Sequence, residues 1–318
     1  MRPSRRLCAV LSHNVHTGGV GKDTSVWMHG IVGTKKNWRT CSKQFLALPA
    51  SHHYGTSLVL EHRGHGESHG MVGNNTVENC ASDLEALLAH TGLDPALVSA
   101  HSFGGKVALK YIERRMQLQS STSPNSMEGG WSGPLRHVWV LDSLPGVYTS
   151  DRPDTANSVF RVLEELSDLP QEFESRDWAV TELQARGIAL PVALWLGTSV
   201  VPVPARGTKG PRRARFGFDI AVIQDLFADF VALDMWPMLD AFAATSRAAR
   251  ANGQVFPTIH YLRAGKNTAW TPHVLDRFAE LEHSSGGGVR LHCMPHVGHW
   301  LHTEDPKGML ELMTREGV

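Results

Sequence analysis

The sequence predicts an α/β fold in which a mostly parallel central sheet is flanked by helices and interrupted by an inserted helical segment. Short apolar runs alternate with stretches of helical spacing along most of the 318 residues, which is the pattern of strands joined by crossover helices. Residues 146–236 break this alternation, because they contain mainly helical patterns. We therefore expect a sheet core formed by residues 1–145 and 237–318, with residues 146–236 inserted as a helical lid.

The expected strands are short runs rich in apolar residues, and they occur at Ser25–Met28, Ser57–Leu60, Ala96–Ala100, His137–Leu141, Pro257–Leu262 and Val289–Cys293. Apolar residues at helical spacing predict the helices, at 37–48, 77–90, 103–116, 158–166, 172–185 and 220–233. A further first strand is expected to begin at Leu7. Residues 117–133, rich in Ser, Pro, Asn and Gly, predict a surface loop.

Composition excludes several classes of protein. Lys and Arg number 31 and Asp and Glu number 31, so the chain lacks the basic excess of a nucleic-acid binder. Hydrophobic residues make up 42% and charged residues 19%, which is typical of a globular protein and not of a disordered one. No run approaches the ~18 apolar residues that a spanning helix needs. The 4 cysteines are far apart, which indicates a reducing compartment and no disulfide framework.

Basic residues cluster at two places in the chain, near the N-terminus and between residues 206 and 215. Arg2, Arg5 and Arg6 precede an apolar run, Leu7–Leu11, that is shorter than the roughly 7–15 residues of a signal-peptide core. We expect a cytoplasmic protein, with a mitochondrial or plastid presequence as the alternative. A second basic cluster, between residues 206 and 215, is expected to be a solvated loop, and an anionic-ligand site is its alternative.

A nucleophile motif lies at the junction of the third predicted strand and the helix after it. The segment Ala100-His101-Ser102-Phe103-Gly104-Gly105 matches G-x-S-x-G, with alanine in place of the first glycine. At such a turn the serine is presented at the edge of the sheet, and its small neighbours, Ala100 and Gly104, allow the turn to close. The Phe103 N–H begins a helix and can donate to a developing oxyanion.

The turn after the first of these strands is the candidate for a second oxyanion donor. In His29-Gly30-Ile31-Val32-Gly33, the backbone N–H of Ile31 is expected to point toward Ser102, with His29 and Gly30 shaping the turn. The alternative is an ordinary strand-to-helix turn. The glycine-containing segment Glu61–Ser68 after the next strand is expected to support the site without taking part in catalysis.

Four motifs in this order resemble the alpha/beta-hydrolase superfamily: H-G-x-x-G at 29–33, R-G-H-G-x-S at 63–68, H-S-F-G-G-K at 101–106 and G-H-W at 298–300. The resemblance covers roughly residues 24–145 and 255–315. It implies the alpha/beta-hydrolase fold and a triad in the chain order serine, acid, histidine. It also implies an acyl-enzyme mechanism that needs no cofactor.

Four histidines near the C-terminus are candidates for the base: His292, His296, His299 and His302. His299 matches the G-H pattern of the superfamily and lies in the predicted loop before the last helix. The alternative is a zinc cluster, since the four are closely spaced. We expect no metal, because no ligand motif such as H-E-x-x-H is present.

The acid does not stand where most of the superfamily places it. The residues after the strand Pro257–Leu262, which are Arg263-Ala-Gly-Lys-Asn-Thr-Ala-Trp270, contain no carboxylate. Asp142 instead follows the strand before the lid, at the same sheet edge as Ser102, and small acyl esterases with an I/L-D-x-x-P segment resemble this arrangement. An alternative is that Asp142 only caps a turn. We predict that Asp142 orients His299.

The predicted function is hydrolysis of a carboxylic ester or thioester through an acyl-enzyme on Ser102. A small-molecule acyl ester or thioester is then the expected partner. Candidate apolar lining comes from the lid and its end, with packing in the core as the favoured alternative for each residue: Trp195, Phe227, Phe230 and Trp236. The serine disfavours dehalogenases and epoxide hydrolases of this fold, which use an aspartate nucleophile, whereas perhydrolysis would use the same triad. The alternative from another class is a ligand-binding or sensing protein with little turnover.

Overall fold

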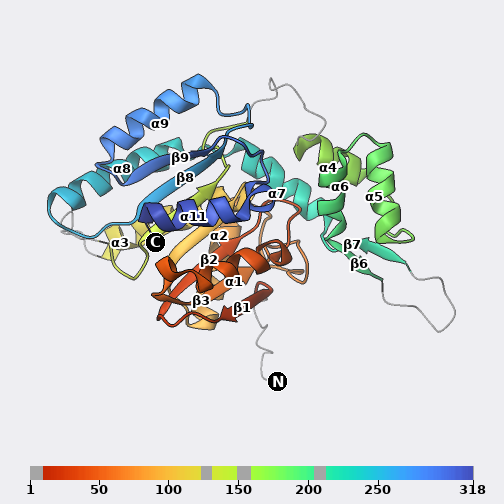
Figure 1. Ribbon diagram of the computed structural model, residues 1–318, viewed down its shortest axis with the longest axis horizontal. Helices are drawn as coiled ribbons and strands as arrows, with labels where there is room; N and C mark the ends of the chain where they lie inside the picture. The colour runs from red at the N-terminus through yellow and green to blue at the C-terminus, as the bar shows by residue number, and fades with distance from the viewer. Residues whose placement is uncertain (1–9, 123–130, 149–158, 204–212, 318) are drawn as a thin grey trace.

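A computed structural model describes residues 10–122, 131–148, 159–203 and 213–317. A 7-stranded sheet with the strand order β1-β3-β2-β4-β5-β8-β9 forms its centre (Figure 1). These strands are β1 (His13–Thr17), β2 (Asp23–Met28), β3 (Tyr54–Leu60), β4 (Pro95–His101), β5 (His137–Leu141), β8 (Thr258–Ala264) and β9 (Val289–Met294). Only the pair of β1 with β3 is antiparallel among the neighbouring strands of this sheet. The predicted fold class is confirmed.

Both faces of the sheet are covered by helices. Because side chains alternate along each strand, neighbouring residues reach opposite faces. In β2, Val26 and Met28 contribute to one hydrophobic core and Trp27 to the other. The Trp27 face is covered by α1 (Arg39–Ala47) and α11 (Pro306–Gly317). The opposite face packs against α2 (Val77–Thr91), α3 (Phe103–Thr122), α8 (Trp236–Ala251) and α9 (Pro272–Ser284). Short helical turns complete the core at Lys35–Trp38, Pro49–Ser51 and α10 (Leu301–Glu304).

The segment between β5 and α8 lies at one side of the sheet core (Figure 1). It contains α4 (Val159–Ser167), α5 (Arg176–Ala185), α6 (Leu190–Gly197), the hairpin of β6 (Val200–Pro202) and β7 (Ala214–Phe216), and α7 (Ile220–Ala232). Its two ends meet, because the Met235 N–H donates to the Pro145 carbonyl at 2.9 Å. The predicted boundaries of the insertion fall at this meeting point and stay a prediction.

The strand expected to begin at Leu7 falls partly outside the described residues, within which the first strand is β1, His13–Thr17. One expectation about the elements needs correction. The helix after Ser102 continues to Thr122, beyond the expected end at Met116, because residues 117–119 are good helix formers. Helix α6 was not predicted as a separate element. Residues 206, 209 and 212 of the basic cluster lie outside the described residues.

Candidate active site

Ser102 stands alone between β4 and α3, in a turn that only a few residue types fit. Its φ is 52°, in the left-handed region that costs a non-glycine residue roughly 1–3 kcal/mol. The turn closes because glycines follow it. A Cβ on Gly104 would lie 2.8 Å from the His29 carbonyl oxygen, and one on Gly105 would lie 2.6 Å from the Ser143 Cβ. The motif thus places Ser102 at the C-terminal edge of the sheet.

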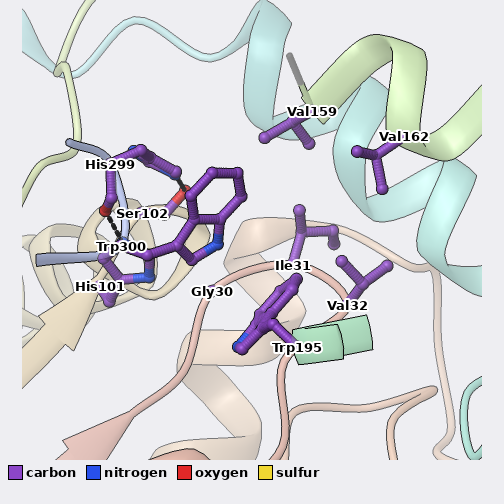
Figure 2. A pocket seen from close by; sticks show the side chains of 10 residues that line it. All are labelled: Gly30, Ile31, Val32, His101, Ser102, Val159, Val162, Trp195, His299 and Trp300. Atoms are coloured by element: carbon purple, nitrogen blue, oxygen red, sulfur yellow. Dashed lines mark hydrogen bonds between the residues drawn. The ribbon is translucent and has the colours of Figure 1, made fainter. Parts of the chain in front are cut away.

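His299 connects Ser102 to Asp142. Its Nε2 lies 3.1 Å from the Ser102 Oγ, and its Nδ1 lies 2.7 Å from the Asp142 Oδ2. Because an ionised carboxylate only accepts hydrogen bonds, Nδ1 donates to Asp142 and Nε2 is left to accept the Ser102 O–H. The carbonyl of His299 also accepts a bond of 2.7 Å from the His101 Nε2–H (Figure 2). The backbone and ring of His299 are therefore both held.

Asp142 follows β5 with a φ of 46°, and its side chain is fully buried. Its Oδ1 accepts from the Ala264 N–H at 2.9 Å and from the Trp270 Nε1–H at 2.7 Å. Its Oδ2 accepts from the Asn267 Nδ2–H at 2.7 Å as well as from His299. Sequence reasoning missed Asn267 and Trp270. The available signal was a segment that lacks a carboxylate and is rich in N–H donors.

The turn after β2 passes close to Ser102. A Cβ on Gly30 would lie 3.1 Å from the Ser102 Cβ, which is a tight contact that glycine avoids. Val32 has a φ of 53°, and its N–H donates to the His65 Nε2 at 3.1 Å. Ile31 lines the pocket beside Ser102 (Figure 2). Phe103 begins α3, where backbone N–H groups have no acceptor inside the helix.

Three buried histidines support this turn. The His29 Nδ1–H donates to the Gly30 carbonyl at 2.7 Å, and the His29 Nε2 accepts from the His62 N–H at 3.2 Å. Burial lowers the pKa of His29 to about 4 and holds those of His62 and His65 well below their ordinary value. All three are therefore neutral near pH 7. Two of them, His62 and His65, belong to the Glu61–Ser68 segment that was expected to support the site.

The pocket above Ser102 is small and apolar. It is lined by Gly30, Ile31, Val32, His101, Ser102, Val159, Val162, Trp195, His299 and Trp300 (Figure 2). It encloses about 10 Å³ of free space, which is room for about one water molecule. Of the four candidate lining residues, Trp195 lines this pocket. Phe227, Phe230 and Trp236 belong to the hydrophobic core, which was the favoured alternative for each.

The other C-terminal histidines have separate partners. His292 pairs with His260 at 3.1 Å, His296 pairs with Asp305 at 2.9 Å, and His302 stacks on Trp38 with ring centroids 4.7 Å apart. Within the described ranges, no three side chains of His, Cys, Asp or Glu are grouped to hold a metal ion. Nor does any helix of those ranges have the length and apolar character to cross a membrane.

The model of the alpha/beta hydrolase family matches residues 26–312. The chain belongs to this family. It is 27% identical over 145 residues to the sn-1-specific diacylglycerol lipase ABHD11 of Mus musculus, which covers 42% of this chain and 46% of the relative. It is 30% identical over 183 residues to the protein of the same name from Danio rerio, covering 55% of this chain and 54% of that one. The chain thus spans about half the length of the curated relatives it matches.

Solved structures share the fold of this hydrolase over nearly its whole length. A marine microorganism esterase has a TM-score of 0.69 at 17% identity, and the match covers 96% of this chain and 99% of that one. At such low identity the likeness shows the fold alone. It carries no information about the function of the insertion or of the pocket residues.

Proposed function

We propose that this hydrolase cleaves carboxylic esters or thioesters through an acyl-enzyme on Ser102. The observation that carries the proposal is the continuous hydrogen-bonded path from the Ser102 Oγ through His299 to Asp142, with distances of 3.1 and 2.7 Å. A serine, an imidazole and a buried carboxylate in this order are what acyl transfer requires.

In this proposal His299 acts first as a base and then as an acid. The His299 Nε2 takes the Ser102 proton as Oγ attacks the acyl carbonyl, while Asp142 stabilises the imidazolium. The N–H groups of Ile31 and Phe103 stabilise the tetrahedral oxyanion. His299 then protonates the leaving alcohol or thiol, and the acyl-enzyme forms. Water, deprotonated by His299, attacks that acyl group and releases the acid and free Ser102.

The lining of the pocket, rather than its free space of about 10 Å³, indicates an uncharged acyl group. Apart from Ser102 and two histidines, its lining is glycine and apolar side chains from the sheet core and from α4 and α6. The names of the two curated relatives indicate an acylglycerol ester for those proteins. We therefore propose a neutral apolar ester as the substrate of this chain, with diacylglycerol, p-nitrophenyl esters and acyl thioesters as the panel to test.

The first experiment is labelling of the purified protein with a fluorophosphonate probe, which reports an activated serine without the true substrate. We expect wild type to label, Ser102→Ala to lose all labelling, and Asp142→Ala to label roughly 10³–10⁴-fold more slowly. Turnover of the ester panel should fall in parallel. Absence of labelling in a well-folded wild type would contradict the proposal and favour a ligand-binding protein.

A further inference from the structure

The loop after β8 approaches Asp142 with hydrogen-bond donors. The segment Arg263–Trp270, which comprises the end of β8 and this loop, contains no carboxylate. Three of its N–H groups nevertheless donate to the Asp142 carboxylate at 2.7 to 2.9 Å, one of them from Ala264 at the end of β8. Two of these donors are side chains, those of Asn267 and Trp270. Neither has a part in the acyl-transfer steps above. The proposed triad alone therefore does not explain why these two side chains donate to Asp142.

We propose that Asn267 and Trp270 are positioning residues that hold the Asp142 carboxylate ready to accept the His299 Nδ1–H. This inference rests on the proposed function. The carboxylate can accept about four hydrogen bonds, and it accepts two on each oxygen. Rotation about its side-chain bonds would break all of them at a position where the carboxylate is fully buried. The loop therefore fixes the oxygen that faces His299.

Each of the two side chains is itself held in one orientation. The Asn267 Oδ1 accepts from the Ala269 N–H at 3.0 Å, so its Nδ2 must be the end that faces Asp142. Trp270 is only 5% exposed. Its ring packs against Phe278 and Tyr261, with centroids 5.5 and 6.4 Å away. The donors are thus preorganised, which is what a positioning role requires.

The same bonds could serve only to stabilise a buried charge, and a double-mutant cycle separates the two roles. Trp270→Phe removes the N–H and keeps most of the ring, and Asn267→Ala removes the amide. Each should lower kcat for an ester about tenfold, the order of a lost bond to a charged group, with KM unchanged. In an Asp142→Asn background, each should have less than about a twofold further effect, because the carboxylate they position is gone.

Trp131→Phe is the matched control for Trp270→Phe. Trp131 is 7% exposed, and among the described residues its Nε1 has no hydrogen-bond partner. This variant should keep the wild-type kcat. Equal losses of kcat in the wild-type and Asp142→Asn backgrounds would overturn the proposal, as would wild-type kcat in both Trp270→Phe and Asn267→Ala. Thermal unfolding of each variant shows that the compared proteins are folded.

A second readout does not depend on turnover. In ¹⁵N-histidine NMR spectra, wild type should show His299 as a single Nδ1–H tautomer, and the Asn267→Ala/Trp270→Phe double variant should show a mixture. A double variant that keeps the single tautomer would overturn the positioning role. If wild type shows no Ser102-dependent labelling or turnover while the tautomer still depends on these two residues, the proposed function fails and the positioning role stands.

Discussion

Backbone strain in this protein is concentrated around one site. In the described part of the chain, three non-glycine residues have a positive φ: Val32, Ser102 and Asp142. Each follows a parallel strand of the sheet, and β2, β4 and β5 are neighbours in it. Such conformations persist only where the surroundings enforce them. Here the buried turns and their hydrogen bonds bring together the three residues to which we assign the oxyanion turn, the nucleophile and the acid.

Gly30 packs closely against the residues around Ser102. A methyl group there would lie 3.1 Å from the Ser102 Cβ and 3.0 Å from the His101 Nδ1, so these neighbours or the turn that carries Ile31 must shift slightly. We expect Gly30→Ala to lower kcat about tenfold or more, since one displaced oxyanion donor costs at least that much.

Gly18→Ala is the control for this substitution, because a Cβ at Gly18 would meet nothing within 4 Å. Steady-state kinetics with a p-nitrophenyl ester measures both variants. Wild-type kcat in Gly30→Ala would show that the turn does not deliver a donor to the reaction.

At the scale of elements, Lys106 joins helix α3, which follows Ser102, to both ends of the insertion. Its ammonium group donates to the carbonyl of Gly146 at 2.9 Å and to those of Phe230 and Leu233 at 2.7 and 2.6 Å. The side chain is fully buried. Gly146 lies shortly after β5, and Leu233 directly follows α7. One cation therefore fixes both ends of the insertion relative to Ser102.

We expect Lys106→Met to lower the free energy of unfolding by about 2–5 kcal/mol, because it leaves buried carbonyl groups without their charged donor. Lys110→Met, one turn later on α3, removes a cation that is paired with Glu113 and only partly buried. It should cost less than about 1 kcal/mol. Urea titration monitored by circular dichroism compares the two. Equal effects would show that Lys106 adds nothing beyond an ordinary ion pair.

Buried and half-buried histidines with lowered pKa values occur in several parts of the molecule. Burial lowers the pKa of His29 and of His137 to about 4 and that of His302 to about 3. His137, His260 and His292 form a hydrogen-bonded row across β5, β8 and β9, with spacings of 3.2 and 3.1 Å. The ring of Trp139 stacks on that of His260 with centroids 4.3 Å apart. The folded state therefore resists protonation at several positions at once.

This resistance predicts acid sensitivity. As the pH falls from 6.5 toward 4, the unfolded chain binds protons that the native His29 and His137 do not. The contribution of each such histidine to the free energy of unfolding is therefore complete above pH 6.5. Below that pH it decreases by about 1.4 kcal/mol per pH unit for each group. Urea unfolding at pH values between 4.5 and 7.5 measures this slope.

His137→Gln should reduce that slope, whereas substitution of the exposed His69 by Gln should leave it unchanged. A slope that His137→Gln does not alter would show that this histidine is protonated equally well in the folded and unfolded chains.

Much of the fold, and part of the site, could be read from local patterns. Strand patterning predicted the α/β class, because apolar alternation depends only on neighbouring residues. Ser102 and Gly30 lie in short turns, and Gly104 lies in the first turn of α3; local sequence motifs indicated all three positions. The edge of the sheet shared by Asp142 and Ser102 also followed, since parallel strands end on the same side. Their catalytic roles stay predictions.

Long-range packing decided the rest. His299 and Asp142 are 157 residues apart, and no local pattern contains their 2.7 Å contact. Trp195 lines the pocket while Phe227 and Trp236 fill the core, although all are aromatic residues of one segment. The role that we propose for Asn267 and Trp270 depends on their contact with Asp142, which is distant in the sequence. Long-range hydrogen bonds and burial depend on residues that are distant in the sequence. The patterns that predict turns and strands, in contrast, lie within a few neighbouring residues.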